Sequence, residues 1–134
     1  MTPSSFQRSR DTAQPSILVV EDETIIGLDL RERLTDYGYY VTQVVAAGAE
    51  AVEAALVNRP RLVLMDIRLK GPMDGITAAE RIREAADIPI VFLTAYVDED
   101  TLLRAHDVSP YGYVLKPFKS EQLLGRLHLN QHQG

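Results

Sequence analysis

Apolar positions along the chain fall into short runs. Nearly continuous runs cover residues 17–20, 62–65, 88–93 and 111–115, and a more mixed run, YVTQVV, covers residues 40–45. Continuous apolar runs are typical of parallel strands covered on both faces, whereas a mixed run suits a strand at the edge of a sheet. The pattern therefore predicts five strands, with residues 40–45 at an edge.

Helical periodicity separates these runs. Apolar residues recur at helical spacing in five segments, marked by Ile26, Leu30 and Leu34; by Ala51, Val52, Ala55 and Leu56; by Ile76, Ala79, Ile82 and Ala86; by Leu102, Leu103 and Ala105; and by Leu123, Leu124 and Leu127. We expect Gly38 to cap the end of the first helix, Asp74 to cap the third and the acidic residues 98–100 to begin the fourth. Alternating strands and helices build an open, mostly parallel sheet with helices on both faces.

Composition indicates one globular domain. The chain has 134 residues, of which 46% are hydrophobic and 25% are charged, as in ordinary soluble proteins. That length suits a single core. Residues 1–15 are polar and end at Pro15, so we expect a flexible leader there, a domain over residues 16–130 and a tail over residues 131–134.

Charge and residue usage argue against several classes of protein. The apolar runs are shorter than the roughly 18 residues of a membrane span, and the N-terminal segment lacks an apolar secretion signal, which favours a cytoplasmic protein. The net charge of −5 argues against direct nucleic-acid binding, and the absence of cysteine removes disulfides and thiolate chemistry. Because the chain ends soon after the last predicted helix, we expect either a stand-alone domain or part of a longer protein.

Polar side chains follow four of the predicted strands directly. They are Glu21, Asp22 and Glu23 after the first, Asp66 after the third, Thr94 after the fourth, and Lys116 with Pro117 after the fifth. In parallel α/β sheets, ligands bind beyond the carboxyl ends of the strands. Each residue alone is an ordinary turn, helix start or surface charge, but together they bring acids, a hydroxyl and a lysine to one edge of the sheet.

Acids gathered at one edge require a cation. Two unit charges about 4 Å apart repel by roughly 4 kcal/mol at an effective dielectric near 20. Mg²⁺ fits best because it takes oxygen ligands and keeps bound waters, and no histidine or cysteine stands among these residues to suggest zinc. The sequence therefore predicts a site for Mg²⁺ and a phosphoryl group.

Four motifs, ILVVEDE, LVLMDIRLKGPMDGI, VFLTAY and GYVLKPF, resemble in this order those of the receiver domain of two-component response regulators. The resemblance implies a flavodoxin-like sheet of strand order 2-1-3-4-5. It also implies a phosphorelay switch that catalyses its own phosphorylation and dephosphorylation and is not a conventional turnover enzyme. The phosphodonor would be a sensor histidine kinase or a histidine phosphotransfer protein, and the downstream protein or output domain stays unassigned.

The resemblance also implies the phosphoacceptor and the metal ligands. Asp66 would accept the phosphoryl group. Asp22, Asp66 and the backbone carbonyl of Arg68 would ligate Mg²⁺, with Glu21 assisting through water. Glu21 stands where the family more often has aspartate, which affects the metal shell.

Further roles follow from the same resemblance. Thr94 and Lys116 would hold the phosphoryl oxygens, and Tyr113 would be an aromatic switch that rotates from exposed to buried. The peptide bond before Pro117 would be cis, which X-Pro bonds tolerate. The fourth helix, fifth strand and fifth helix would form the readout face, including Leu103, Tyr111 and Leu124, where a homodimer could form.

Two bulky residues stand beside the expected site. Arg68 follows the phosphoacceptor by two positions, and Tyr96 follows Thr94 by two. They are either solvated side chains at the rim or modulating residues that obstruct the water which hydrolyses the aspartyl phosphate.

Other readings fit the sequence less well. A phosphatase with an aspartate nucleophile wants a second acid at the position of Arg68, and a calcium loop wants oxygen ligands at Arg68 and Lys70. The glycine-rich phosphate loop of nucleotide hydrolases is absent. A receiver-like docking module that works without phosphorylation stays open as an alternative.

Overall fold

A single sheet of five parallel strands organises the molecule. The computed structural model describes residues 14–95 and 97–133, with side chains up to residue 127. The strands are β1 (Ser16–Val20), β2 (Tyr40–Val45), β3 (Leu62–Asp66), β4 (Ile90–Thr94) and β5 (Gly112–Leu115). Their order is β2-β1-β3-β4-β5, and every pairing is parallel. The flavodoxin-like order and the edge position of β2 are both confirmed.

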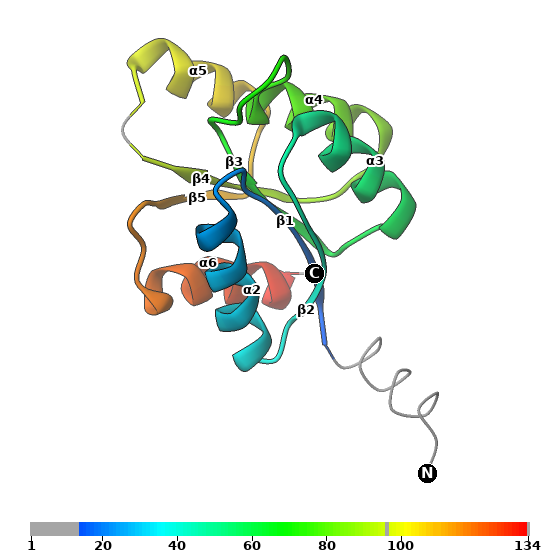
Figure 1. Ribbon diagram of the computed structural model, residues 1–134, viewed down its shortest axis with the longest axis vertical. Helices are drawn as coiled ribbons and strands as arrows, with labels where there is room; N and C mark the ends of the chain where they lie inside the picture. Colours follow the sequence, from blue (N-terminus) through cyan, green and yellow to red (C-terminus); the bar gives the residue numbers. More distant parts are fainter. Residues whose placement is uncertain (1–13, 96, 134) are drawn as a thin grey trace.

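Helices cover both faces of this sheet. They are α2 (Thr24–Asp36), α3 (Gly48–Asn58), α4 (Gly75–Ala85), α5 (Glu99–Asp107) and α6 (Ser120–Gln133). Figure 1 shows α2 and α6 on one face and α3, α4 and α5 on the other. The predicted alternation of strand and helix is confirmed. The last helix continues through residues 131–133, which the sequence analysis assigned to a tail.

The two helical layers enclose separate cores, because successive strand residues point to opposite faces. Leu18 and Val20 of β1 pack into the core beneath α3 and α4, whereas Ile17 and Val19 pack into the core beneath α2 and α6. All four side chains are almost fully buried. Burial on both faces explains why the strands read as continuous apolar runs.

The helix ends follow the sequence signals closely. Asp74 caps α4 as predicted, and α5 begins in the acidic run 98–100 as predicted, with Asp98 as its cap. Each capping carboxylate accepts a hydrogen bond from the backbone N–H three residues later, at 2.8 and 2.9 Å. The first helix ends at Asp36, with Tyr37 as its C-cap. Gly38 is therefore not the cap but the residue after it, where its φ of 94° suits glycine.

The surface carries scattered apolar side chains. The short helix predicted from Leu102, Leu103 and Ala105 is α5; Ala105 is fully buried, whereas Leu102 and Leu103 are 45% and 59% exposed. The helix presents only a narrow stripe to the core, and both leucines stay outside.

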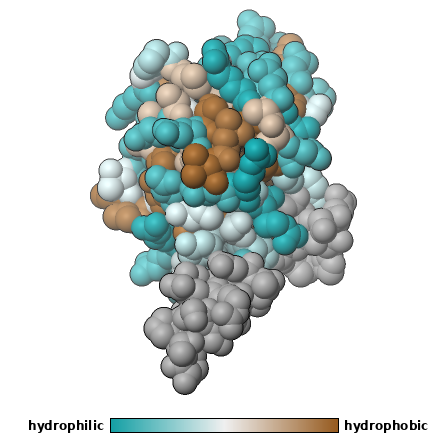
Figure 2. Space-filling model, turned by 90° about the vertical axis from the view of Figure 1, so that its right-hand side faces the viewer, coloured by the Kyte–Doolittle hydropathy of each residue, from teal (hydrophilic) through white to brown (hydrophobic). Residues whose placement is uncertain are grey.

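Figure 2 shows another apolar area, bordered by hydrophilic residues, on the side of the molecule along which α3 lies, and Val57 of α3 is among the exposed apolar residues. In the described ranges, no helix combines the length and hydrophobicity that crossing a bilayer requires.

Helix α4 begins in direct contact with the end of β3. A Cβ on Gly75 would overlap the carbonyl oxygen of Asp66, and the Gly75 N–H donates to the carbonyl oxygen of Ile67 at 2.9 Å. Only glycine allows two backbones to approach this closely. Gly75 therefore fixes the start of α4 against the residue that carries the Asp66 carboxylate.

We expect Gly75→Ala to lower the free energy of unfolding by roughly 1 to 3 kcal/mol, because the added methyl group must displace backbone atoms. Urea denaturation measures the change. Gly125→Ala is the matched control: a Cβ on Gly125 of α6 meets nothing within 4 Å, so that substitution should stabilise by about 0.4 to 1 kcal/mol. Equal effects of the two substitutions would show that the close approach at Gly75 is not a constraint.

Candidate functional site

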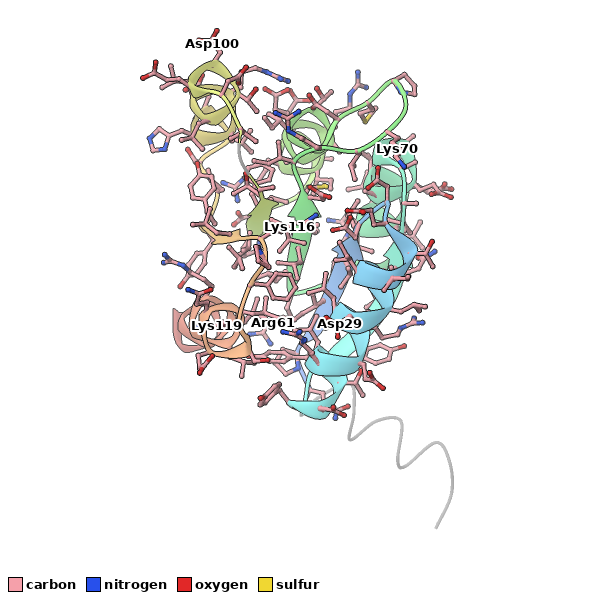
Figure 3. All side chains as sticks on the ribbon, turned by 60° about the vertical axis from the view of Figure 1, so that its left-hand side comes forward. Asp29, Arg61, Lys70, Asp100, Lys116 and Lys119 are labelled. Atoms are coloured by element: carbon pink, nitrogen blue, oxygen red, sulfur yellow. The ribbon has the colours of Figure 1, made fainter. Side chains whose placement is uncertain are left out.

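The polar residues that follow the strands meet at one edge of the sheet, as the sequence predicts. Asp22, Asp66, Thr94 and Lys116 line one open pocket of about 380 Å³. The side chain of Glu21 is fully buried next to Lys116. Figure 3 shows Lys116 near the middle of the molecule, where the carboxyl ends of the strands converge.

Three acids form the cluster that the sequence predicts. Carboxylate oxygens of Glu21, Asp22 and Asp66 lie within 4.8 Å of one another. Asp66 is only 5% exposed, although it lines the pocket. Its strand is central in the sheet, between β1 and β4, and the Lys116 ammonium lies over its carboxylate.

Lys116 supplies the charge that these acids require. Its Nζ lies 2.8 Å from Oε1 of Glu21 and 2.9 Å from Oδ2 of Asp66. The backbone N–H of Lys116 donates to the carbonyl oxygen of Thr94 at 2.8 Å, which fixes the strand end, and the peptide bond to Pro117 is cis, as predicted. One ammonium is thus shared by two buried carboxylates.

The shared ammonium perturbs the acids unequally. Burial raises the pKa of Glu21, and the Lys116 charge opposes this only in part because the neighbouring Asp66 repels the ionised form. Oε1 of Glu21 accepts no hydrogen bond in the described part of the chain beyond its ion pair. Burial alone would lower the pKa of Lys116, but its two carboxylate partners outweigh burial and raise it. Lys116 therefore stays charged. Its single positive charge does not balance the negative charges of the acids, and the pKa of Glu21 stays raised.

Backbone donors orient each acid. The Glu23 N–H donates to Oε2 of Glu21 at 3.1 Å. The Lys70 N–H donates to Oδ2 of Asp22 at 2.9 Å, and the Arg68 N–H donates to Oδ1 of Asp66 at 3.1 Å. Sequence reasoning missed these donors because any residue except proline offers a main-chain N–H. The segment after β3 therefore supplies donors to two acids from different strands.

Thr94 and Tyr113 lie on neighbouring strands. The buried Thr94 hydroxyl donates to the carbonyl oxygen of Ala95 at 2.9 Å. The Tyr113 ring lies 6.1 Å from the Phe92 ring and packs partly against the core, and burial raises its pKa. Tyr113 is therefore half-buried rather than exposed in this state, because Phe92 gives it an apolar neighbour.

Of the two residues predicted to modulate hydrolysis, the structure describes only Arg68. The Arg68 side chain is exposed, and its charge contributes to the lowered pKa of Asp98, which results mainly from hydrogen bonds with Thr101. Tyr96 lies outside the described residues. Whether these two side chains obstruct the hydrolytic water therefore stays a prediction.

One ion pair that the sequence did not reveal joins two helices. Nη1 of Arg104 on α5 lies 3.2 Å from Oδ2 of Asp74, the capping residue of α4. Burial acts to raise the pKa of the Asp74 carboxyl, but the hydrogen bond from the Thr77 N–H and the pairing with Arg104 together lower it. Periodicity within one helix carries no signal for a partner on another. The pair connects α5 to the helix that starts against Asp66.

The pH dependence of stability should reveal the cost of ionising the buried Glu21. Because the folded pKa of Glu21 is raised above its ordinary 4.5, the unfolded chain ionises first, and stability falls as the pH rises from about 4.5 through the folded pKa. We expect Glu21→Gln to remove this fall in metal-free buffer, because the amide does not ionise. Chemical denaturation of both proteins between pH 4 and 8 measures the difference. Parallel profiles would mean that burial does not penalise the Glu21 charge.

Comparisons with known proteins agree with this geometry. Residues 17–128 match the family described as the response regulator receiver domain. The transcriptional regulatory protein PdtaR of Mycobacterium tuberculosis is 39% identical over 120 residues, which cover 89% of this chain and 58% of that protein. The DNA-binding response regulator MtrA of Mycolicibacterium smegmatis is 36% identical over 117 residues, 87% of this chain and 50% of the relative. The chain thus spans between half and three-fifths of these relatives.

Solved structures show the same architecture. The signal receiver domain of a modulated diguanylate cyclase from Desulfovibrio desulfuricans superimposes with a TM-score of 0.85 at 37% identity, over 90% of this chain and 95% of that one. The BeF3-activated N-terminal receiver domain of RstA from Klebsiella pneumoniae gives a TM-score of 0.78 at 31% identity, over 86% and 97% of the two chains. The chain belongs to the response regulator receiver domain family.

Proposed function

We propose that this receiver domain is a phosphorylation-activated switch in which Asp66 accepts a phosphoryl group from a sensor histidine kinase or histidine phosphotransfer protein. The observation that supports this most strongly is the contact of Lys116 Nζ with Asp66 Oδ2, at 2.9 Å inside a cluster of three acids. A nucleophilic carboxylate, a cation beside it and a pocket of about 380 Å³ are what phosphoryl transfer requires.

The residues of the chain supply positioning and charge. The carboxylate of Asp66 attacks the phosphorus in line, the bond from phosphorus to the donor nitrogen breaks, and an aspartyl phosphate forms. Lys116 neutralises negative charge on the phosphoryl oxygens, and Thr94 donates its hydroxyl to one of them once it leaves the Ala95 carbonyl. The domain promotes its own phosphorylation and dephosphorylation, without turnover of a separate substrate.

The donor set fits Mg²⁺. Every side-chain ligand in the cluster is a carboxylate oxygen, and Oε1 of the buried Glu21 shares a single ammonium with Asp66. Asp22, Asp66 and the carbonyl oxygen of Arg68 would hold the ion, and Glu21 would reach it through water. When bound, Mg²⁺ would neutralise charge that develops on the transferring group.

The phosphoacceptor can be tested by intact mass measurement after incubation with a small acyl phosphate and Mg²⁺. We expect the parent chain to gain one phosphoryl group and Asp66→Asn to gain none, because the amide is not a nucleophile. A phosphoryl gain that persists in Asp66→Asn would refute the assignment.

Asp22→Ala serves as the companion variant, because Asp22 belongs to the acid cluster but does not contact Lys116. It should keep the phosphoacceptor and need a higher Mg²⁺ concentration for the same rate of phosphorylation. An unchanged Mg²⁺ requirement would contradict its role as a ligand. Loss of phosphoryl gain in the parent as well would favour the alternative, a docking module that works without phosphorylation.

Phosphorylation would be read out on the face formed by α5, β5 and α6. The phosphoryl group adds roughly two negative charges, draws the Thr94 hydroxyl inward and leaves space for the half-buried Tyr113 to turn further in. Leu103 is exposed on this face, whereas Tyr111 and Leu124 pack partly into the core beneath α6. A homodimer or a downstream protein would bind there.

Amide NMR spectra with and without Mg²⁺ and beryllofluoride, a phosphoryl mimic, test this readout. We expect shifts along α5, β5 and α6, and smaller ones along α3. Coupling between such sites is typically about 1 to 3 kcal/mol. Spectra that change only next to Asp66 would argue against a signalling face.

Arg68 and Tyr96 should set the life of the aspartyl phosphate. If their side chains obstruct the hydrolytic water, replacing both with alanine should speed spontaneous dephosphorylation while phosphorylation persists. Each 1.36 kcal/mol removed from the barrier raises the rate about tenfold. The rate of phosphate loss measures the effect, and an unchanged or slower rate would leave them as solvated rim residues.

A further inference from the structure

The loop that carries Lys116 leaves the sheet at its edge. Lys116 directly follows β5, an edge strand that pairs only with β4 among the described strands. Residues 116–119 then lead to α6, and the Lys116 side chain is only 15% exposed. The sheet holds this loop at Lys116 through the hydrogen bond from the Lys116 N–H to the Thr94 carbonyl oxygen, whereas the segment that leads on to α6 is held by contacts from its other side.

Arg33 of α2 makes that contact. Its Cζ lies 5.3 Å from the centroid of the Phe118 ring, and its Nη1 donates to the hydroxyl of Ser120, the first residue of α6, at 3.4 Å. Its Nε pairs with Asp29 one turn earlier on α2, at 3.1 Å. The guanidinium is thus held by its own helix on one side and covers the loop on the other.

Phe118 belongs to the same loop as Lys116. The ring packs against the core beneath α2 and α6 and stands two positions after Lys116. Figure 3 shows Asp29 on α2 and Lys119 at the start of α6 in the same lower part of the molecule, with Lys116 above them, and Figure 1 shows the two helices as neighbours. A guanidinium over an aromatic face is an attractive arrangement with a defined geometry.

Helix α2 therefore reaches both sides of the site. Its first residue, Thr24, follows the acidic segment that contains Glu21 and Asp22, and Arg33 lies nine residues further along, about 14 Å at the helical rise. One rigid element sets the acids at one end and the lysine loop near the other.

We propose that Arg33 is a positioning residue for Lys116: by fixing Phe118 and Ser120 against α2, it keeps the ammonium between Glu21 and Asp66, where it can meet a phosphoryl group. The role at the phosphoryl group rests on the proposed function, whereas the position of the ammonium does not.

The position of the ammonium can be followed without any phosphorylation. The chain has three lysines, Lys70, Lys116 and Lys119, so lysine-selective ¹³C labelling resolves their ε-CH₂ groups by NMR. We expect two distinct ε-proton shifts for Lys116 in the parent chain, because the side chain is held, and one averaged shift in Arg33→Ala. Lys70, on the far side of the pocket, should not change. An unchanged Lys116 signal in Arg33→Ala would overturn the proposal.

Three further variants separate positioning from general folding. Phe118→Leu keeps an apolar side chain but removes the ring face, so it should reproduce the effect of Arg33→Ala on the Lys116 signal. If Arg33→Ala does not fold, Phe118→Leu tests the proposal in its place. Arg33→Lys keeps the positive charge over the ring and should restore part of the signal. Arg31→Ala, at an exposed position on the same helix, should leave the Lys116 signal as in the parent; a change there equal to that of Arg33→Ala would contradict the proposal.

The phosphorylation rate supplies a second test. With a small acyl phosphate and Mg²⁺, Arg33→Ala should react roughly two- to fivefold more slowly than the parent, as expected for one lost cation–π contact. In a Lys116→Ala background the same substitution should have no further effect, because residues that act through one another are not additive. Equal slowing in both backgrounds would show that Arg33 acts independently of Lys116. A parent chain that takes no phosphoryl group would refute the proposed function, and the NMR result would still decide the role of Arg33.

Discussion

One ammonium between two buried carboxylates is the interaction on which the site depends. Glu21 and Asp66 end neighbouring strands, and both are withdrawn from solvent, so their charges repel in a medium that screens them poorly. Lys116 reaches both acids from β5, across β4. Its single charge reduces the repulsion but leaves the cluster negative. A cluster that stays negative favours binding a further cation.

The backbone is arranged around that interaction. Gly75 lets α4 start against the Asp66 carbonyl, and the segment between β3 and α4 turns two N–H groups toward Asp66 and Asp22. On the opposite side, the contact between Arg33 and Phe118 ties the lysine loop to α2. The acids and the ammonium are therefore held by separate elements. Helix α4 starts against Asp66, and the pair of Asp74 and Arg104 connects α4 to α5.

The sequence predicts the fold and the members of the site because both depend on strong local signals. Apolar runs locate the strands, and the polar residues that end them must converge at the carboxyl edge of a parallel sheet. The depth of Asp66 is not predictable in this way, since it depends on the neighbouring strands and on a lysine from β5. The same holds for the half-buried Tyr113, whose surroundings come from distant segments.

Contacts between distant residues are the part that sequence patterns do not reveal. The sequence around Arg33 is typical of an exposed helix position, and that around Phe118 is typical of a loop. In the structure the Arg33 guanidinium lies over the Phe118 ring. The backbone donors to the acids are not predictable from the sequence either, because every residue except proline has an N–H group. Both kinds of contact determine where the predicted side chains point, so the sequence identifies the chemical groups and the structure supplies their geometry.

A crystal structure of the chain with Mg²⁺ and beryllofluoride tests the phosphoacceptor site most directly. The account predicts beryllofluoride on the Asp66 carboxylate, a metal ion bound by Asp22 and Asp66, and Lys116 Nζ within hydrogen-bond distance of a fluorine. Density for neither group at Asp66, with Lys116 still bridging Glu21 and Asp66 as it does in the present structure, would contradict it.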